Sequence, residues 1–125
     1  MHTRIATALT ALLLLAPLAH AAFRDLLAAY INSTNSVVQV LTAIKTEADA
    51  KNQTAALANA VAAMKSAKAQ VAANSNNAAE VEAAVRERTA DLQKATAALY
   101  EETHRIKNNP DLKRALAPVI AKLAE

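Results

Sequence analysis

The residues best suited to chemistry in this chain are Glu101 and His104, which are spaced three apart. A Glu-x-x-His pair on one face of a helix supplies two ligands to carboxylate-bridged metal centres inside four-helix bundles. Such centres need a second pair and two further glutamates, whereas the preceding helical segments offer mainly Glu47 and Asp49, near their junction. We therefore interpret His104 as a surface histidine near a helix C-terminus, where its cation is favoured, and expect no metal site.

Nucleophilic catalysis finds little support elsewhere in the chain. His104 is the one histidine after residue 21, and the chain has no cysteine, so a nucleophile has few partners to activate it. Because glycine is also absent, there is no G-x-S-x-G turn and no glycine-rich loop that would cradle phosphate. We predict that the protein is not an enzyme, with no catalytic residues and no cofactor.

Two segments match the acceptor pattern for N-linked glycosylation, Asn32-Ser33-Thr34 and Asn52-Gln53-Thr54. The pattern matters only in a compartment that holds the glycosylation machinery. Both segments lie in polar helical or junction sequence, and so short a pattern recurs by chance. We interpret both as chance matches.

The first 21 residues have the three parts of a secretory signal peptide. A short positive segment ends at Arg4, an apolar run covers residues 5–18, and Ala19-His20-Ala21 is an A-x-A processing site. The apolar run is shorter than the roughly 20 residues that a bilayer-spanning helix needs, and Pro17 interrupts its end. No cysteine follows that would accept a lipid. We expect cleavage after Ala21 and export to the periplasm or the extracellular space.

The composition predicts one all-helical domain over residues 22–125. This length suits a single modest core, which packing alone must stabilise because there are no disulfides. The chain lacks glycine, which β-rich folds use in turns, and alanine, the best helix former, is its commonest residue. Once Arg4 is removed, 13 basic and 11 acidic side chains give a net charge of +2. These charges are interleaved from Glu80 onward, so we expect no nucleic-acid partner.

The spacing of apolar residues predicts a first helix over residues 23–44. Apolar or small residues recur in steps of four and three, at Phe23, Leu27, Tyr30, Thr34, Val37, Leu41 and Ile44, with Leu26, Ile31 and Val38 widening the seam. Residues 32–36 have poor helix propensity, so a bend or a frayed turn is expected there. The seam suits a coiled coil between two molecules as well as an intramolecular core.

A break is expected near Thr46, whose hydroxyl would cap a second helix with Asp49 three positions later. Residues 44–51 are also compatible with one continuous helix, and the sequence leaves the two interpretations open. The second helix has one apolar side, formed by Leu57, Val61, Met64 and Val71. Alanines around that side would let a neighbouring helix approach closely.

A polar loop at residues 74–77 precedes a third long helix, with Asn77 as its cap and Glu80 as the N3 partner. One stripe holds its apolar residues, Val81, Val85, Leu92, Leu99 and Ile106, together with Thr89, Thr96 and Thr103. Glu82 with Arg86, and Glu101 with Arg105, have the spacing of exposed ion pairs.

Asn109 as a cap and Pro110 at the first helical position predict a short last helix. Its apolar face comprises Leu112, Leu116, Val119 or Ile120, and Leu123, and Pro118 predicts a kink or a restart. Three long helices and one short C-terminal helix, joined by short connections, predict an antiparallel helical bundle or helical hairpins.

Two pairs of short motifs carry a resemblance. Val40-Leu41-Thr42-Ala43-Ile44-Lys45 and Ala48-Asp49-Ala50-Lys51 are similar to a V-L-x-x-I-K-[D] then [ST]-A-K turn between two helices. Glu102-Thr103-His104-Arg105-Ile106 and Asn109-Pro110-Asp111-Leu112 are similar to E-x-x-R-[VI] and x-P-x-L elements. The chain thus resembles a group of small exported bacterial alanine-rich helical proteins, although Thr46 stands where they commonly have aspartate. The resemblance implies a helical fold and export, and no activity.

Our functional expectation is an exported, non-enzymatic helical bundle that acts by binding or as a structural module, with a protein partner or self-association. The alternative is a peripheral protein whose amphipathic helices open at a lipid surface. Few aromatic anchors and mixed surface charge favour the first interpretation.

Overall fold

The computed structural model describes residues 22–124, which form four helices. The predicted signal peptide falls on residues 1–21 and lies outside this range. The helices are α2 (Phe23–Ala43), α3 (Glu47–Ala73), α4 (Ala78–Lys107) and α5 (Pro110–Leu123). The all-α prediction of three long helices and one short C-terminal helix is confirmed. Of the four, none combines the length and the hydropathy that a segment crossing a bilayer would require.

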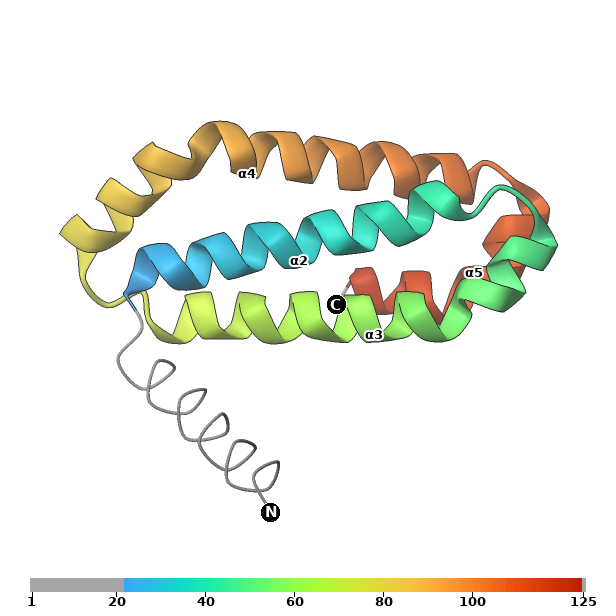
Figure 1. The fold of residues 1–125 in the computed structure, drawn as a ribbon, viewed down its shortest axis with the longest axis horizontal. Coiled ribbons are helices and arrows are strands. Elements are labelled where there is room, and N and C mark those ends of the chain that lie inside the picture. The colour runs from blue at the N-terminus through green and yellow to red at the C-terminus, as the bar shows by residue number, and fades with distance from the viewer. Residues whose placement is uncertain (1–21, 125) are drawn as a thin grey trace, which may run out of the picture.

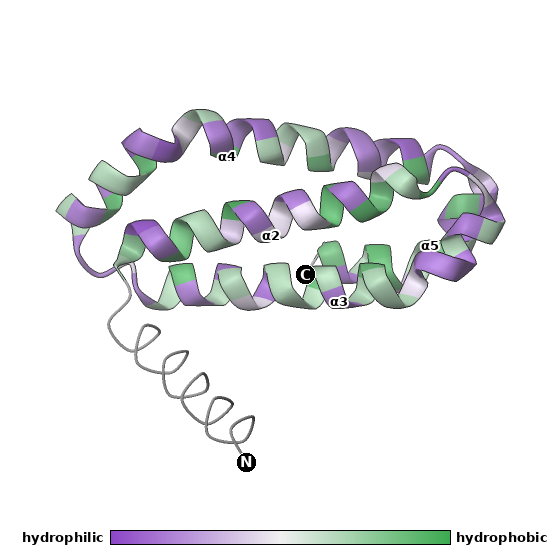
Figure 2. Ribbon diagram, in the orientation of Figure 1, coloured by the Kyte–Doolittle hydropathy of each residue, from purple (hydrophilic) through white to green (hydrophobic). Residues whose placement is uncertain are grey.

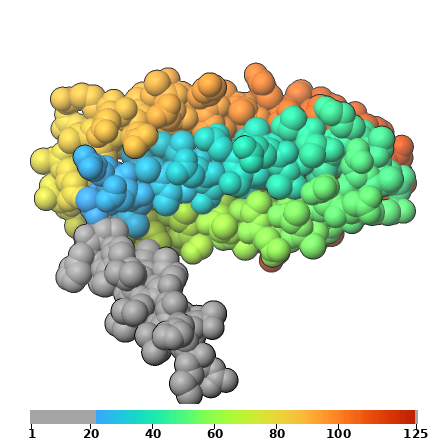
Figure 3. Space-filling view, viewed as in Figure 1, coloured from blue at the N-terminus to red at the C-terminus, as the bar shows by residue number. Residues whose placement is uncertain are grey.

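The helices are arranged as two hairpins, α2 with α3 and α4 with α5 (Figure 1). α2 packs against both α3 and α4, and α5 packs against α3 and α4 from the other side. The space-filling view shows α2 between α4 and α3 on one face of the molecule (Figure 3). α2 and α4 run in the same direction, so their first residues lie at one end of the bundle and their last residues at the other.

Side chains near the first turns set where three of the helices begin. At α3, the N–H of Asp49 donates to Thr46 Oγ1 and the N–H of Thr46 donates to Asp49 Oδ2, both at 3.1 Å. This capping box shows that α2 and α3 are separate helices, which the sequence had left open. Asn77 caps α4 through the N–H of Glu80, and Asn109 caps α5. All three predicted caps are therefore present.

The core has two parts. We call the part that includes α5 the four-helix end; its buried residues are Val37, Leu41, Ile44, Ala50, Leu57, Val61, Met64, Ile106, Leu112, Leu116 and Val119. The part built from α2, α3 and α4 alone is the three-helix end. Its buried residues are Phe23, Leu27, Ile31, Ala84 and Ala95, with Val71, Val81 and Leu92 half-buried against them. α5 has only 14 residues, so it covers only part of the length of α3 and α4.

The predicted seam of α2 is the one that the fold buries: Tyr30 is half-buried, and Phe23, Leu27, Thr34, Val37, Leu41 and Ile44 are buried. The helix also continues through residues 32–36, where a bend or a frayed turn was expected. The Thr34 hydroxyl donates to the Tyr30 carbonyl at 2.9 Å, and Ser33 and Ser36 make the same contact one turn back. These hydroxyls are satisfied without leaving the helix. α5 likewise runs through Pro118 as one helix, so the expected restart does not occur.

The predicted stripe of α4 is only partly buried, which corrects the sequence interpretation. α4 directs Ala84, Ala95 and Ile106 into the core, whereas Val85 is 37% exposed and Leu92 is half-buried. The small alanine side chains let α2 and α4 approach closely. Because the alanine side of α4 faces α2, the larger apolar residues of α4 lie on a different side of the helix. Figure 2 shows hydrophobic and hydrophilic residues alternating along the visible side of α4. α5 then covers only the C-terminal part of that flank.

Candidate functional site

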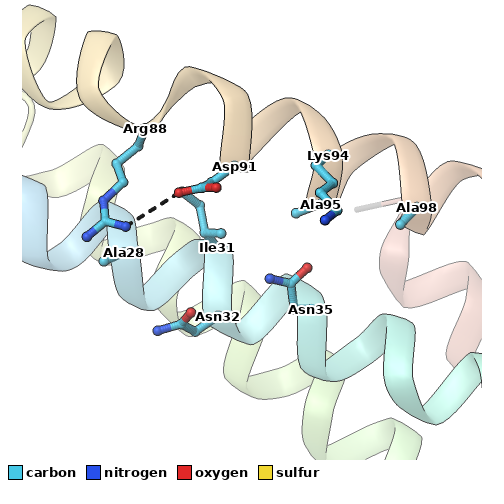
Figure 4. Close-up of a pocket in the computed structure, with 9 residues that line it drawn as sticks. All are labelled: Ala28, Ile31, Asn32, Asn35, Arg88, Asp91, Lys94, Ala95 and Ala98. Carbon is cyan, nitrogen blue, oxygen red and sulfur yellow. Dashed lines mark ion pairs between the residues drawn. The ribbon is translucent and has the colours of Figure 1, made fainter.

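A polar cleft of about 490 Å³ lies between α2 and α4 and is the candidate site (Figure 4). α2 contributes Ala28, Ile31, Asn32 and Asn35, and α4 contributes Arg88, Asp91, Lys94, Ala95 and Ala98. The two sets are more than 50 positions apart in the chain, and the parallel packing of α2 and α4 brings them together. The cleft is partly open to solvent.

Small side chains make the hollow. Ala28, Ala95 and Ala98 line the cleft without filling it, and Ile31, which is 5% exposed, is its one larger apolar residue. Neither helix has a glycine or a proline here that would interrupt it. The cleft walls are therefore two regular helices, which set the backbone positions from which these side chains extend.

The rim of the cleft is charged. Arg88 Nη1 and Asp91 Oδ2 are 3.5 Å apart, one turn from each other on α4, and their side chains are 41% and 60% exposed. An ion pair this exposed contributes about 0 to 1 kcal/mol, because water screens it. Breaking this pair so that Arg88 or Asp91 can bind a ligand group therefore costs little free energy.

The chemistry that these groups support is recognition of a polar or anionic partner. Arg88 and Lys94 bring two positive charges against the single negative charge of Asp91, and Asn32 and Asn35 each offer amide donors and an acceptor. The nine lining residues include no histidine and no hydroxyl group. The cleft thus presents groups that bind and orient a ligand through hydrogen bonds and charge.

The sequence did not indicate this site: it placed Asn32 in a glycosylation pattern, Ile31 in the seam of α2, and residues 32–36 in a segment of poor helix propensity. Mixed charges at Arg88, Asp91 and Lys94 look like any solvated helix face. The feature that marks the site is that alanines of α4 lie opposite polar residues of α2. Only the packing of the two helices shows this.

The Glu-x-x-His pair does not form a site in the described structure. Glu101 and His104 are both exposed on α4, and the His104 ring stacks on Tyr100 with centroids 5.8 Å apart and an angle of 12° between the planes. Among residues 22–124 no three His, Asp or Glu side chains are gathered closely enough to hold a metal ion.

Ion pairing along α4 follows the sequence prediction at one position and departs from it at another. Glu82 and Arg86 form the expected pair at 2.6 Å. Arg105, however, pairs with Glu102 at 2.8 Å rather than with Glu101, and its Nη2 also donates to the Leu41 carbonyl at 2.7 Å. The contact with Leu41 turns Arg105 toward α2, which places Glu102 beside it.

Glu80 also has a partner that the sequence did not indicate. Its Oε1 accepts the backbone N–H of Phe23 at 2.7 Å, so the carboxylate caps the first turn of α2 from another helix. Together with Arg105 it ties both ends of α2 to α4. These contacts hold the two walls of the cleft in register.

No protein-family model matches the chain, and no curated protein or solved structure is significantly similar to it.

Proposed function

We propose that this chain is an exported, non-enzymatic helical-bundle protein that acts by binding a polar partner in the cleft between α2 and α4. The predicted signal peptide supports export, and processing after Ala21 would leave a chain that begins one residue before α2.

The cleft is the observation on which this proposal rests. It joins two cations, one carboxylate and two amides over an alanine-lined floor, on two helices that Glu80 and Arg105 hold together. A bound carboxylate or amide group would accept hydrogen bonds from Arg88 and Lys94, while Asn32 and Asn35 would pair with neighbouring polar atoms. Preformed walls lower the ordering cost of such binding.

Affinity capture from the native envelope tests the proposal, with processed protein immobilised as the bait. The informative variant is Arg88→Ala with Lys94→Ala, which removes both cations of the cleft. We expect the captured partner to bind at least about tenfold more weakly, since each charged hydrogen bond lost costs about 1.5 to 3 kcal/mol.

The matched control is Lys51→Ala with Arg114→Ala, which makes the same change in net charge at exposed residues outside the cleft. It should retain the partner at the original affinity. Equal loss in both variants would show that overall charge, and not the cleft, attracts the partner. Flotation of the wild-type chain with neutral vesicles would instead support the peripheral lipid-binding alternative.

A further inference from the structure

A second surface lies on α4, away from the cleft. We call it the outer flank of α4, formed by Val85, Leu92, Thr96 and Tyr100. Val85 and Tyr100, at 37% and 69% exposure, are the exposed large hydrophobic residues of the part that the structure describes. The four residues are spaced by seven, four and four positions, so they lie along one side of the helix.

The outer flank combines a protruding group with hollows beside it. An open hollow of about 650 Å³ is lined by Leu92, Thr96 and Tyr100 among others, and a smaller one of about 250 Å³ extends from the same threonine and tyrosine to Ile120 and Leu123 of α5. Tyr100 lines both hollows. A surface with such hollows can receive side chains from an identical chain packed about a two-fold axis.

The charges on this flank select an orientation for such a contact. Glu82 precedes Tyr100 by 18 residues, which is five turns at 3.6 residues per turn, so it lies on the same side at the N-terminal end. Lys107 lines the smaller hollow at the C-terminal end. Glu82 also pairs with Arg86 on its own helix, at 2.6 Å. A second α4 in the antiparallel direction would bring Glu82 of each copy within about one helical turn of Lys107 of the other, whereas a parallel one would place Glu82 beside Glu82.

We propose that the outer flank of α4 is a self-association surface, on which a second copy of this chain packs antiparallel about a two-fold axis near Gln93. That axis sets Val85 of each copy opposite Tyr100 of the other. It also covers the apolar residues of α4 that α5 is too short to reach. The proposal concerns a different face from the cleft and does not depend on the cleft having a ligand.

Sedimentation equilibrium of the processed chain tests the association. We expect a dimer at concentrations of about 100 µM, and a dimer dissociation constant raised about tenfold or more in Val85→Glu and in Tyr100→Glu. Ala63→Glu, on the exposed face of α3, is the control and should leave the dimer unchanged. Circular dichroism melting checks that each variant is folded. We expect all of them to fold, because the substituted positions are exposed.

Single cysteines test the register, because the chain has none of its own. Gln93→Cys, near the axis, should form a disulfide-linked dimer under mild oxidation, whereas Val85→Cys, far from its own copy, should not. Glu82→Lys and Lys107→Glu should each weaken the dimer, and the two together should restore it.

Three results would overturn the proposal. The first is a monomer throughout the concentration range, and the second is efficient cross-linking at residue 85 as well as 93, which indicates a parallel contact. The third is a monomer that binds vesicles and loses this binding in Tyr100→Glu, which would assign the flank to a lipid surface.

Discussion

The two ends of the bundle differ in how completely they bury their core. At the four-helix end, Leu41, Ile44, Leu57, Ile106 and Leu116 are all fully buried. At the three-helix end, Phe23, Leu27 and Ile31 retain 3 to 5% exposure, and none of its described large side chains is fully buried. Both ends have half-buried neighbours, and at the four-helix end Met64 and Val119 retain 6% and 8% exposure. The difference is α5, which packs on α3 and α4 over only part of their length. Residues of the polar cleft and of the outer flank border the three-helix end, so the surfaces available for binding adjoin the less complete core.

The largest expected effect comes from truncating one leucine at each end of α2. Leu41→Ala should lower the free energy of unfolding by about 3 to 4 kcal/mol, because α5 keeps the cavity from collapsing. Leu27→Ala should cost less, about 2 to 3 kcal/mol, since side chains at the three-helix end can move into the space. Urea denaturation measures both. Equal costs would mean that the two ends are packed equally well.

Arg105 distinguishes a tertiary contact from a surface ion pair. Arg105→Ala removes the donor to the Leu41 carbonyl as well as the pair with Glu102, so it should cost about 1 to 2 kcal/mol. Arg86→Ala removes only an exposed pair and should cost no more than about 0.5 kcal/mol. Thermal or urea unfolding compares them. A cost for Arg105→Ala as small as that for Arg86→Ala would show that the contact with α2 contributes nothing.

Glu80 tests how the opposite end of α2 is held. Glu80→Gln keeps the size of the side chain and weakens its hydrogen bond to the Phe23 N–H, so the loss of stability should be small, about 0.5 to 1 kcal/mol. Hydrogen exchange should accelerate at amides of the first turn of α2 and stay unchanged near Leu41. Uniform acceleration along α2 would contradict a local role.

The smallest effect concerns the junction of α2 and α3 and depends on pH. The backbone N–H groups of Lys45 and Thr46 lower the pKa of Asp49 below its ordinary value. Because the folded pKa is the lower one, the stabilisation is present above the unfolded pKa of about 3.9 and disappears as the pH falls through the folded pKa. Asp49→Asn should therefore melt below wild type at pH 7 and coincide with it in strong acid. A difference in melting temperature that persists in acid would contradict this origin.

Sequence reasoning located the helices because the interactions that define them are local. Thr46, Asn77 and Asn109 each cap a helix through an N–H two or three residues away, and the α2 seam from Phe23 to Ile44 has a single apolar side to bury. The disruption expected at residues 32–36 and at Pro118 was overestimated. Packing keeps α2 and α5 helical there although the local sequence has poor helix propensity.

The buried side of α4 was predicted less accurately than that of α2, because two sides of α4 are available for packing. Its valine and leucine stripe has the larger transfer free energy, but the alanine side permits the closer approach to α2. The choice depends on a neighbour that the sequence of α4 does not contain. For the same reason Arg105 pairs with Glu102 and Leu41 rather than with Glu101.

The sequence by itself determined the helical class, the candidate caps at Thr46, Asn77 and Asn109, and the buried side of α2, since propensity, capping and periodicity act within a few turns. Only the tertiary structure decided which side of α4 meets α2, that a polar cleft forms between them, and that an apolar flank stays uncovered beyond α5. The first two features arise from contacts between residues of α2 and α4 that are more than 50 positions apart, and the third arises from the short length of α5. Their energies depend on helix packing in space.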